Sequence, residues 1–277
     1  MAEQSWRGGV AVVTGAGSGM GRAFARRLGR EEGMRLGILD VEAAALEAVQ
    51  RELEGEGVEV VAVRADVSDA AAVKEAADAI LGRWGTVDVL INNAGIEGYL
   101  DGPIWEAEAS DWAWTFGVNF WGVVHCTQQF LPAMLAQDRG LIVNTASMTA
   151  LVTSRNMYAI TKHAVLAFSE TLRQDLAQRG SKVQVAALCP GIVATRLFQG
   201  SRNRPARYQR ESKPSEWEKG QALRETMHQR LAQGMDPAEV VSITLDGVRR
   251  GKFYILTDHE WDPQIIERHQ EILAGAP

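Results

Sequence analysis

Short runs rich in Val, Ile and Leu recur along this chain, and amphipathic stretches separate them. Most of these runs show no alternation of polar and apolar residues, which is typical of parallel strands covered on both faces. The stretches between them, such as 21–32 and 69–84, are rich in Ala, Leu, Glu and Arg and have the length of crossover helices. The expected strands are residues 10–14, 36–40, 58–63, 87–91, 141–145, 183–188 and 253–256.

This alternation predicts an α/β fold with a doubly wound, parallel, seven-stranded sheet, of the Rossmann-like kind. No linker rich in Gly, Pro or Ser divides the chain, so we expect a single domain over residues 1–277. After Pro190 a long polar run precedes a helix near 237–249. A long insertion near the strand ends is typical of a binding lid, and we place a substrate lid at about 192–235.

Composition and charge narrow the function further. A formal charge of −6 argues against binding to nucleic acid or an anionic membrane. Cys126 and Cys189 lie far apart, and neither they nor the five histidines show metal-ligand spacing, so we expect no disulfide framework and no metal. The N-terminus lacks the apolar segment of a secretion signal. We therefore expect a cytoplasmic protein that acts on a small molecule.

One stretch, residues 112–137, contains no Asp, Glu, Lys or Arg and is long enough to cross a bilayer. A membrane span is the lesser alternative, because polar residues and a proline interrupt it. We expect a helix buried on most of its surface. The interrupting residues are Asn119, His125, Gln128, Gln129 and Pro132.

A glycine-rich turn follows the first expected strand, where Gly15, Gly17, Gly19 and Gly21 alternate with other residues. Glycine lets the backbone approach a pyrophosphate closely and present amides at the positive end of a helix. Met20 stands where a strict GxGxxG pattern has Gly or Ala, so the spacing is a variant. Taken alone, the pattern also fits an ordinary glycine-rich turn.

Asp40 ends the second expected strand, nineteen residues after Gly21. A carboxylate there can accept hydrogen bonds from the adenosine ribose and would repel a 2′-phosphate, which favours NAD. Ala16, Ser18 and Val41 offer no basic side chain to neutralise such a phosphate. The alternative is an aspartate that caps a helix.

Tyr158 and Lys162 are four residues apart and share one face of an expected helix. A nearby ammonium favours the phenolate and lowers the tyrosine pKa, so the pair suits proton exchange with an alcohol or ketone. Ser147 follows the fifth expected strand, where its hydroxyl could hold the substrate oxygen. Asn119 is costly to bury without a partner, which suggests a role in the site.

With these motifs the chain resembles the short-chain dehydrogenase/reductase family, of the compact, single-domain type. The likeness covers nearly the whole chain, and it implies an NAD-dependent oxidoreductase that transfers hydride between the nicotinamide and a secondary alcohol or ketone. The matching motifs are Thr14-Gly15-x-x-x-Gly19-x-Gly21, Asp66-Val67, Asn92-Asn93-Ala94-Gly95, Asn119, Ser147, Tyr158-x-x-x-Lys162, Pro190-Gly191 and Thr195.

The resemblance also implies residue roles. Asn119, Ser147, Tyr158 and Lys162 would form the catalytic tetrad, with Asn119 anchoring a water that links Lys162 to solvent. Asp66 would hold the adenine ring. The expected cofactor contacts are Gly15, Ser18, Gly19, Met20, Gly21, Asp40, Asp66, Val67, Asn93, Ala94, Gly95, Tyr158, Lys162, Pro190, Gly191, Val193 and Thr195.

Residues expected by position to face the substrate are mainly apolar, which favours a bulky ring-like body, although several of them could simply pack the lid. They are Glu97, Tyr99, Leu100, Met148, Leu151, Val152, Met157, Ile192 and Phe198. Six basic residues between 196 and 213 fit either a solvated loop or an arginine that meets a substrate carboxylate or the pyrophosphate. They are Arg196, Arg202, Arg204, Arg207, Arg210 and Lys213.

Aromatic residues crowd the start of the uncharged helix, and the resemblance implies that this helix and the Tyr158 helix pair with those of another subunit. We therefore expect a homodimer or homotetramer. The crowded residues are Trp112, Trp114, Phe116, Phe120 and Trp121. Two rival functions remain open: a catalytically silent NAD-binding regulator, and an epimerase or dehydratase, which would usually need a longer C-terminal region.

Overall fold

The computed structural model describes residues 6–152, 154–211 and 218–275. A seven-stranded sheet with the order β3-β2-β1-β4-β5-β6-β7 forms its centre, and every pair of neighbouring strands is parallel. The prediction of a doubly wound parallel sheet is confirmed. The strands are β1 (Val10–Thr14), β2 (Arg35–Asp40), β3 (Val60–Arg64), β4 (Val89–Asn92), β5 (Leu141–Thr145), β6 (Gln184–Cys189) and β7 (Tyr254–Leu256).

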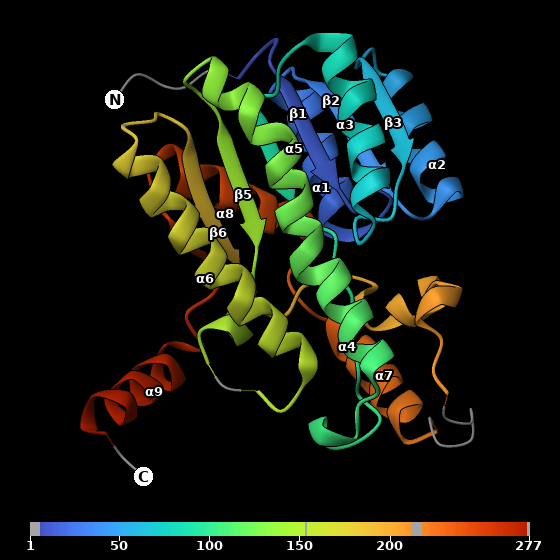
Figure 1. The fold of residues 1–277 in the computed structure, drawn as a ribbon, viewed down its shortest axis with the longest axis vertical. Coiled ribbons are helices and arrows are strands. Elements are labelled where there is room, and N and C mark those ends of the chain that lie inside the picture. Colours follow the sequence, from blue (N-terminus) through green and yellow to red (C-terminus); the bar gives the residue numbers. More distant parts are fainter. Residues whose placement is uncertain (1–5, 153, 212–217, 276–277) are drawn as a thin grey trace.

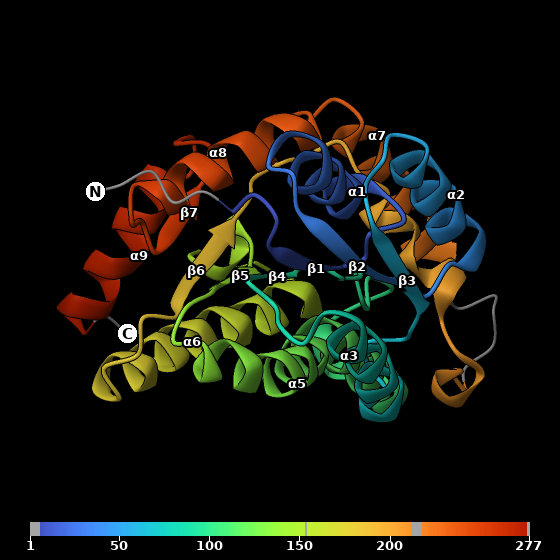
Figure 2. The ribbon, with the colours of Figure 1, turned by 90° about the horizontal axis from the view of Figure 1, so that it is seen from above.

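Helices cover both faces of the sheet (Figures 1 and 2). One face carries α1 (Gly19–Arg26), α2 (Ala43–Glu54) and α8 (Pro237–Arg249). The other carries α3 (Ala70–Trp84), α5 (Gly122–Ala136) and α6 (Met157–Gln178). Each face has its own apolar core. The central strands β1, β4 and β5 are therefore buried from both sides, which explains their Val, Ile and Leu content, while the edge strands β3 and β7 are partly exposed.

The uncharged stretch forms a helix that runs through α4 (Ala109–Phe116), a π-helical turn (Gly117–Trp121) and α5. Buried residues line it throughout, from Trp114 to Met134. The expectation of a largely buried helix agrees with this packing. In the described parts of the chain, no helix has both the length and the hydropathy to cross a membrane.

After β6 the chain forms two 3-10 segments, Leu197–Asn203 and Ala206–Tyr208, and the helix α7 (Glu218–Leu231). Sequence analysis expected a helix only near 237–249, so α7 within the polar run was missed. These segments lie beyond the carboxyl ends of the strands, next to α4 (Figure 1). A last helix, α9 (Asp262–Ala274), was also missed, and it lies at the opposite side of the molecule with no buried residue.

Candidate active site

A cleft of about 170 Å³ lies at the carboxyl edge of the sheet, where β1 and β4 lie side by side and the strand order reverses. In open α/β sheets such a switch point is where ligands bind. The lining combines the glycine turn, the ends of β2 to β5, α6 and the segment after β6. It consists of Gly15, Ser18, Gly19, Met20, Asp40, Val41, Glu42, Ala65, Asp66, Val67, Asn93, Ala94, Gly95, Ile96, Trp114, Val118, Thr145, Tyr158, Lys162, Thr195, Arg196, Leu197, Gly200, Arg202 and Asn203.

The glycine turn brings backbone to the floor of this cleft. Gly15 has a φ of 66°, a conformation that L side chains rarely adopt, and a Cβ on Gly21 would come 2.0 Å from the Gly15 carbonyl oxygen. Ser18 is the N-cap of α1, and its side chain makes no capping hydrogen bond. The first amides of α1 are thus open to an anion, which fits a dinucleotide pyrophosphate.

Two acids stand at the end of β2. Asp40 accepts hydrogen bonds from the backbone N–H groups of Gly17 (2.8 Å) and Glu42 (2.9 Å). Burial raises the pKa of Asp40, and these two backbone hydrogen bonds oppose the rise. The Glu42 carboxylate accepts a hydrogen bond from Asn203 (3.0 Å) and pairs with Arg202, which holds its pKa below the usual value despite burial.

The Asn92–Gly95 segment is hydrogen-bonded to Thr14, at the start of the glycine turn. The backbone N–H groups of Asn93 and Ala94 donate to the Thr14 hydroxyl at 2.9 and 3.0 Å, and the Asn93 amide donates to the Thr14 carbonyl. Asn92 donates to Asn144 of β5 at 2.8 Å. This segment therefore joins β1, β4 and β5 at the point where the cleft opens.

Tyr158 and Lys162 lie on the first two turns of α6, which Asn156 caps by accepting from the Ala159 N–H at 2.7 Å. Lys162 Nζ is 5.4 Å from the centre of the Tyr158 ring and donates to the Thr145 carbonyl at 2.7 Å. Ser147 lies just beyond β5, close enough to the Tyr158 phenol to lower its pKa, and its Oγ accepts from the Thr149 N–H at 3.2 Å and from the Thr149 hydroxyl at 3.1 Å. Three members of the expected tetrad are thus assembled by β5 and α6.

The pKa values of this pair differ from the sequence expectation. Burial raises the pKa of Tyr158 to about 12, and the hydrogen bond from Ser147 only partly opposes the rise. Burial also lowers the pKa of Lys162 to about 8. Removal from water disfavours both the phenolate and the ammonium, so desolvation outweighs the expected lowering of the Tyr158 pKa by Lys162.

Asn119 lies in the π-helical turn and is completely buried. Its carbonyl oxygen accepts from the Ile96 N–H at 2.8 Å, and its amide donates to the Ile96 carbonyl and the Thr161 hydroxyl at 3.0 Å each. These hydrogen bonds compensate the free-energy cost of burying the Asn119 amide. Asn119 thereby fixes the segment after β4 to α6, and π-turns of this kind often occur at functional sites.

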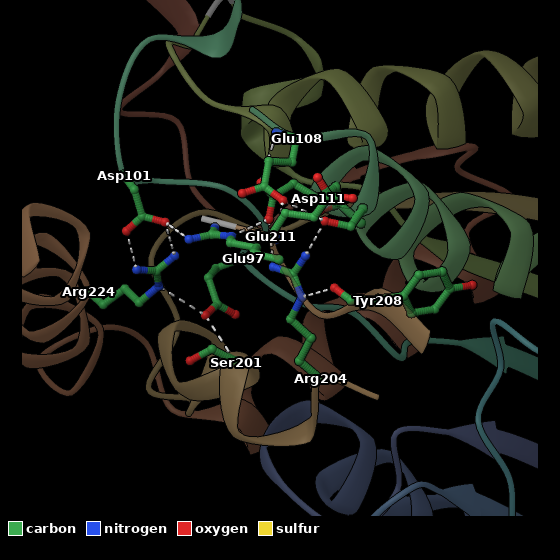
Figure 3. Close-up of polar contacts among 12 residues, drawn as sticks. Glu97, Asp101, Glu108, Asp111, Ser201, Arg204, Tyr208, Glu211 and Arg224 are labelled. Carbon is green, nitrogen blue, oxygen red and sulfur yellow. Dashed lines mark hydrogen bonds and ion pairs between the residues drawn. The ribbon is translucent and has the colours of Figure 1, made fainter. Parts of the chain in front are cut away.

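The described arginines of the arginine-rich segment pair with acids of this chain, and two of them, Arg196 and Arg202, also line the cleft. Arg204 and Arg210 bind Asp111 at 2.6 and 2.7 Å, as part of the polar network in Figure 3. Arg207 binds Asp66 at 2.7 Å. Arg196 lies 3.8 Å from the carboxylate of Glu42. Lys213 lies outside the described residues.

Some expected contacts lie outside the cleft lining. Gly21 is buried beneath the turn, and the Val193 side chain packs in the core while its backbone bridges to Met235. Pro190 and Gly191 precede the lining segment, and the Gly191 N–H donates to Thr257. Asn119 and Ser147 are buried and are not among the lining residues. None of the nine residues expected to face the substrate lines the cleft.

Sequence reasoning also missed several residues that do line the cleft. Ile96, Trp114, Val118, Leu197 and Gly200 give its apolar wall. Ile96 could have been predicted from the sequence, because it directly follows the Asn93-Ala94-Gly95 motif. The others come from a helix and a lid whose orientation no local pattern indicates.

Comparison with known proteins identifies the class. A short chain dehydrogenase family model matches residues 9–206, so the chain belongs to the short-chain dehydrogenase family. It is an oxidoreductase of hydroxyl or ketone substrates that uses a nicotinamide cofactor.

Similar proteins have named activities or solved structures. The chain is 42% identical over 194 residues to 1-deoxy-11-beta-hydroxypentalenate dehydrogenase of Streptomyces avermitilis, covering 69% of this chain and 71% of that protein. It is 32% identical to the CLA biosynthesis dehydrogenase/reductase of Lactiplantibacillus plantarum, over 97% and 94% of the two chains. A solved Burkholderia phymatum short chain dehydrogenase/reductase in complex with NAD is 38% identical, with a TM-score of 0.93, over 99% and 97%.

Proposed function

We propose that this protein is an NAD-dependent dehydrogenase or ketone reductase that uses Tyr158 as its catalytic acid and base. The observation that carries the proposal is the convergence of Tyr158, Ser147 and Lys162 at the carboxyl edge of the sheet, beside the glycine turn. When bound, the nicotinamide would supply or accept the hydride. The expected cofactor contacts that line the cleft, from Gly15 to Thr195, would hold it.

Each residue of the site has a distinct chemical task. In reduction, the Tyr158 hydroxyl gives its proton to the substrate oxygen, and in oxidation it takes the proton back. The Ser147 hydroxyl lies beside the phenol, where it lowers the Tyr158 pKa, and it can donate to the substrate oxygen as charge develops there. Lys162 places positive charge behind the Tyr158 ring, and Asn119 holds the adjoining backbone.

The acids at the end of β2 support NAD over NADP. Asp40 and Glu42 both line the cleft, and a ribose 2′-phosphate near them would meet negative charge. Arg196 and Arg202 line the same region, but both face Glu42. The NAD complex of the Burkholderia phymatum protein agrees with this choice.

The lining near Tyr158 supports a secondary alcohol or ketone with a bulky apolar body. Ile96, Trp114, Val118 and Leu197 offer hydrocarbon and ring surface. The lid arginines pair with acids of the protein, so apolar contact is what this wall mainly provides.

The first prediction tests the acid and base. Cyclic, aromatic and steroid-like alcohols and ketones are screened by NADH absorbance, with NADP in parallel. Tyr158→Phe should lower kcat by about 10²- to 10⁴-fold, because the proton donor is lost, while NADH still binds in fluorescence titration. Tyr254→Phe is the matched control, since the exposed Tyr254 lies on the edge strand β7 and its phenol bonds to Glu170, away from the cleft.

Three results would contradict the proposal. Full turnover by Tyr158→Phe would remove Tyr158 from the chemistry. An NADH-binding protein with no turnover of any substrate by the unaltered chain would favour a regulator, and faster turnover with NADP would contradict the argument from Asp40.

We also propose that the protein is a homodimer or homotetramer, through the outer face of α4, α5 and α6. Ring contacts run along this face from Trp112 through Phe116 and Phe120 to Trp121, and Trp121 is 50% exposed. Large aromatic side chains left on a surface are typical of subunit interfaces.

The second prediction concerns this face. Solution scattering at micromolar concentration should give at least twice the monomer mass, and Trp121→Glu should shift it towards the monomer because a charge would be buried in the interface. Trp105→Glu, at an exposed tryptophan before α4, should leave the mass unchanged. A monomeric mass for the unaltered protein would refute the oligomer.

A further inference from the structure

Glu97 is a carboxylate buried between the catalytic centre and the lid. Its side chain is only 1% exposed, and its pKa is raised by burial. A carboxylate in such a place is costly unless charge and hydrogen bonds compensate it. The identity of its partners therefore indicates what the residue is for.

The partners of Glu97 come from two separate parts of the lid (Figure 3). The Ser201 N–H, in the 3-10 segment, donates to Glu97 Oε1 at 3.2 Å, and Arg224 Nε of α7 lies 3.5 Å from the same oxygen. Gly200 packs directly on the carboxylate, since a Cβ there would come 2.3 Å from Oε2. Glu97 thus fixes both lid elements at one point.

Arg224 extends this contact into a larger buried network. It donates to both carboxylate oxygens of Asp101, at 2.8 and 3.3 Å. Arg210 bridges Asp101 to Asp111, which also binds Arg204. The lid is therefore held against the segment that follows β4 by alternating charges with little exposure to solvent.

On the side of the active site, Glu97 directly follows Ile96, whose backbone is hydrogen-bonded to Asn119 of the expected tetrad. Asn119 binds both the N–H and the carbonyl of Ile96, and its amide also binds Thr161 of α6, between Tyr158 and Lys162. A continuous set of bonds therefore runs from α6 through Asn119 and Ile96 to Glu97 and the lid. Ile96 and Gly200, at either side of Glu97, both line the cleft.

We propose that Glu97 is a positioning residue that sets the lid against Asn119, and that it thereby determines how bulky a substrate the wall at Gly200 and Leu197 admits. The substrate part of this inference depends on the proposed dehydrogenase function. The lid part does not, because it concerns contacts within the protein.

The test compares Glu97→Gln with Glu225→Gln. The first substitution keeps the size of the side chain and an oxygen that can accept from Ser201, but it removes the charge that pairs with Arg224. Glu225 is exposed on the same α7 helix, next to Arg224, and bonds to Gln229, so it matches the chemical change away from the network.

Hydrogen exchange measures the lid without any substrate. Peptides over residues 197–203 and 220–231 should exchange about tenfold faster in Glu97→Gln, and as in the unaltered protein in Glu225→Gln. Unchanged exchange in Glu97→Gln would overturn the inference, whatever the enzyme activity proves to be.

Kinetics separates positioning from a general loss of structure. For the best bulky ketone, Glu97→Gln should raise KM about tenfold with kcat within about twofold, while a small ketone is little affected. Equal losses for both ketones, or a fall in kcat alone, would overturn the role in specificity. If Glu97→Gln does not fold, Arg224→Gln breaks the same pair from the lid side, and the same kinetic pattern is required.

Discussion

Tyr158 and Lys162 show how burial poises a proton-transfer pair. With the pKa of Tyr158 near 12, the residue is a phenol throughout the neutral range, which suits protonation of a ketone oxygen. With the pKa of Lys162 near 8, its positive charge is present at neutral pH and is lost as the pH rises further. Tyr158 is therefore already protonated for its role as an acid in reduction, whereas oxidation requires stabilisation of its phenolate form.

These two pKa values predict how the rate of reduction depends on pH. In the reduction direction, kcat/KM should be constant from about pH 6 to about 7.5 and should fall above about pH 8, because Lys162 loses its proton while Tyr158 keeps its own. Lys162→Arg should be less active than the unaltered protein, but arginine keeps its charge at high pH. Its kcat/KM for reduction should therefore stay constant to a higher pH. The profile is measured from initial rates in buffers of constant ionic strength.

Oxidation supplies the internal control: it needs a proton acceptor, so its kcat/KM should rise from about pH 6 to about 7.5, where the reduction profile is flat. A reduction profile that is flat to about pH 9.5 in the unaltered protein would contradict the assignment of Lys162 as the titrating group. A fall above about pH 8 that persists unchanged in Lys162→Arg would point to another group.

At the scale of elements, the sequence predicts those that bury a clear apolar pattern. β1 and β5 match their expected bounds, and so does α8, because each packs Val, Ile or Leu into the core. α7 was missed because it is largely polar, whereas α9 contains Ile and Leu but buries no residue and leaves Ile266, Ile272 and Leu273 exposed. Polar helices such as α7 carry little periodic signal.

The residues of the site likewise include some that the sequence predicts and some that it does not. Gly15, Tyr158 and Lys162 belong to local motifs, and their spacing predicts which sheet edge and helix face they occupy. The pairing of Arg204 with Asp111 joins residues 93 apart, so no local pattern could indicate it. The π-turn that buries Asn119 also departs from the 3.6-residue period on which helix prediction depends.

At the scale of the whole molecule, the lid crosses the cleft rather than covering only its substrate end. At one end the buried network around Asp111 and Asp101 holds it against the segment after β4. Farther along the lid, Arg202 binds Glu42, and Arg207 binds Asp66, on the side where the resemblance places the adenosine. We therefore expect lid opening and cofactor release to be linked.

The last prediction tests that link at Arg207, which donates to Asp66 at 2.7 Å and to the Ser68 hydroxyl at 2.9 Å. Both partners are partly exposed, so the pair contributes modestly, and Arg207→Gln should speed NADH dissociation by roughly two- to fivefold in stopped-flow displacement. High salt should accelerate release from the unaltered protein and should affect the variant less, because screening weakens the same ion pair.

Two controls separate this contact from general effects. Reduced nicotinamide mononucleotide lacks the adenosine half, so it should dissociate from the unaltered protein and from Arg207→Gln at similar rates. Arg83→Gln, on α3 and 3.9 Å from Glu59, controls for the loss of one surface charge. Equal NADH release from Arg207→Gln and Arg83→Gln would show that the lid opens independently of this contact.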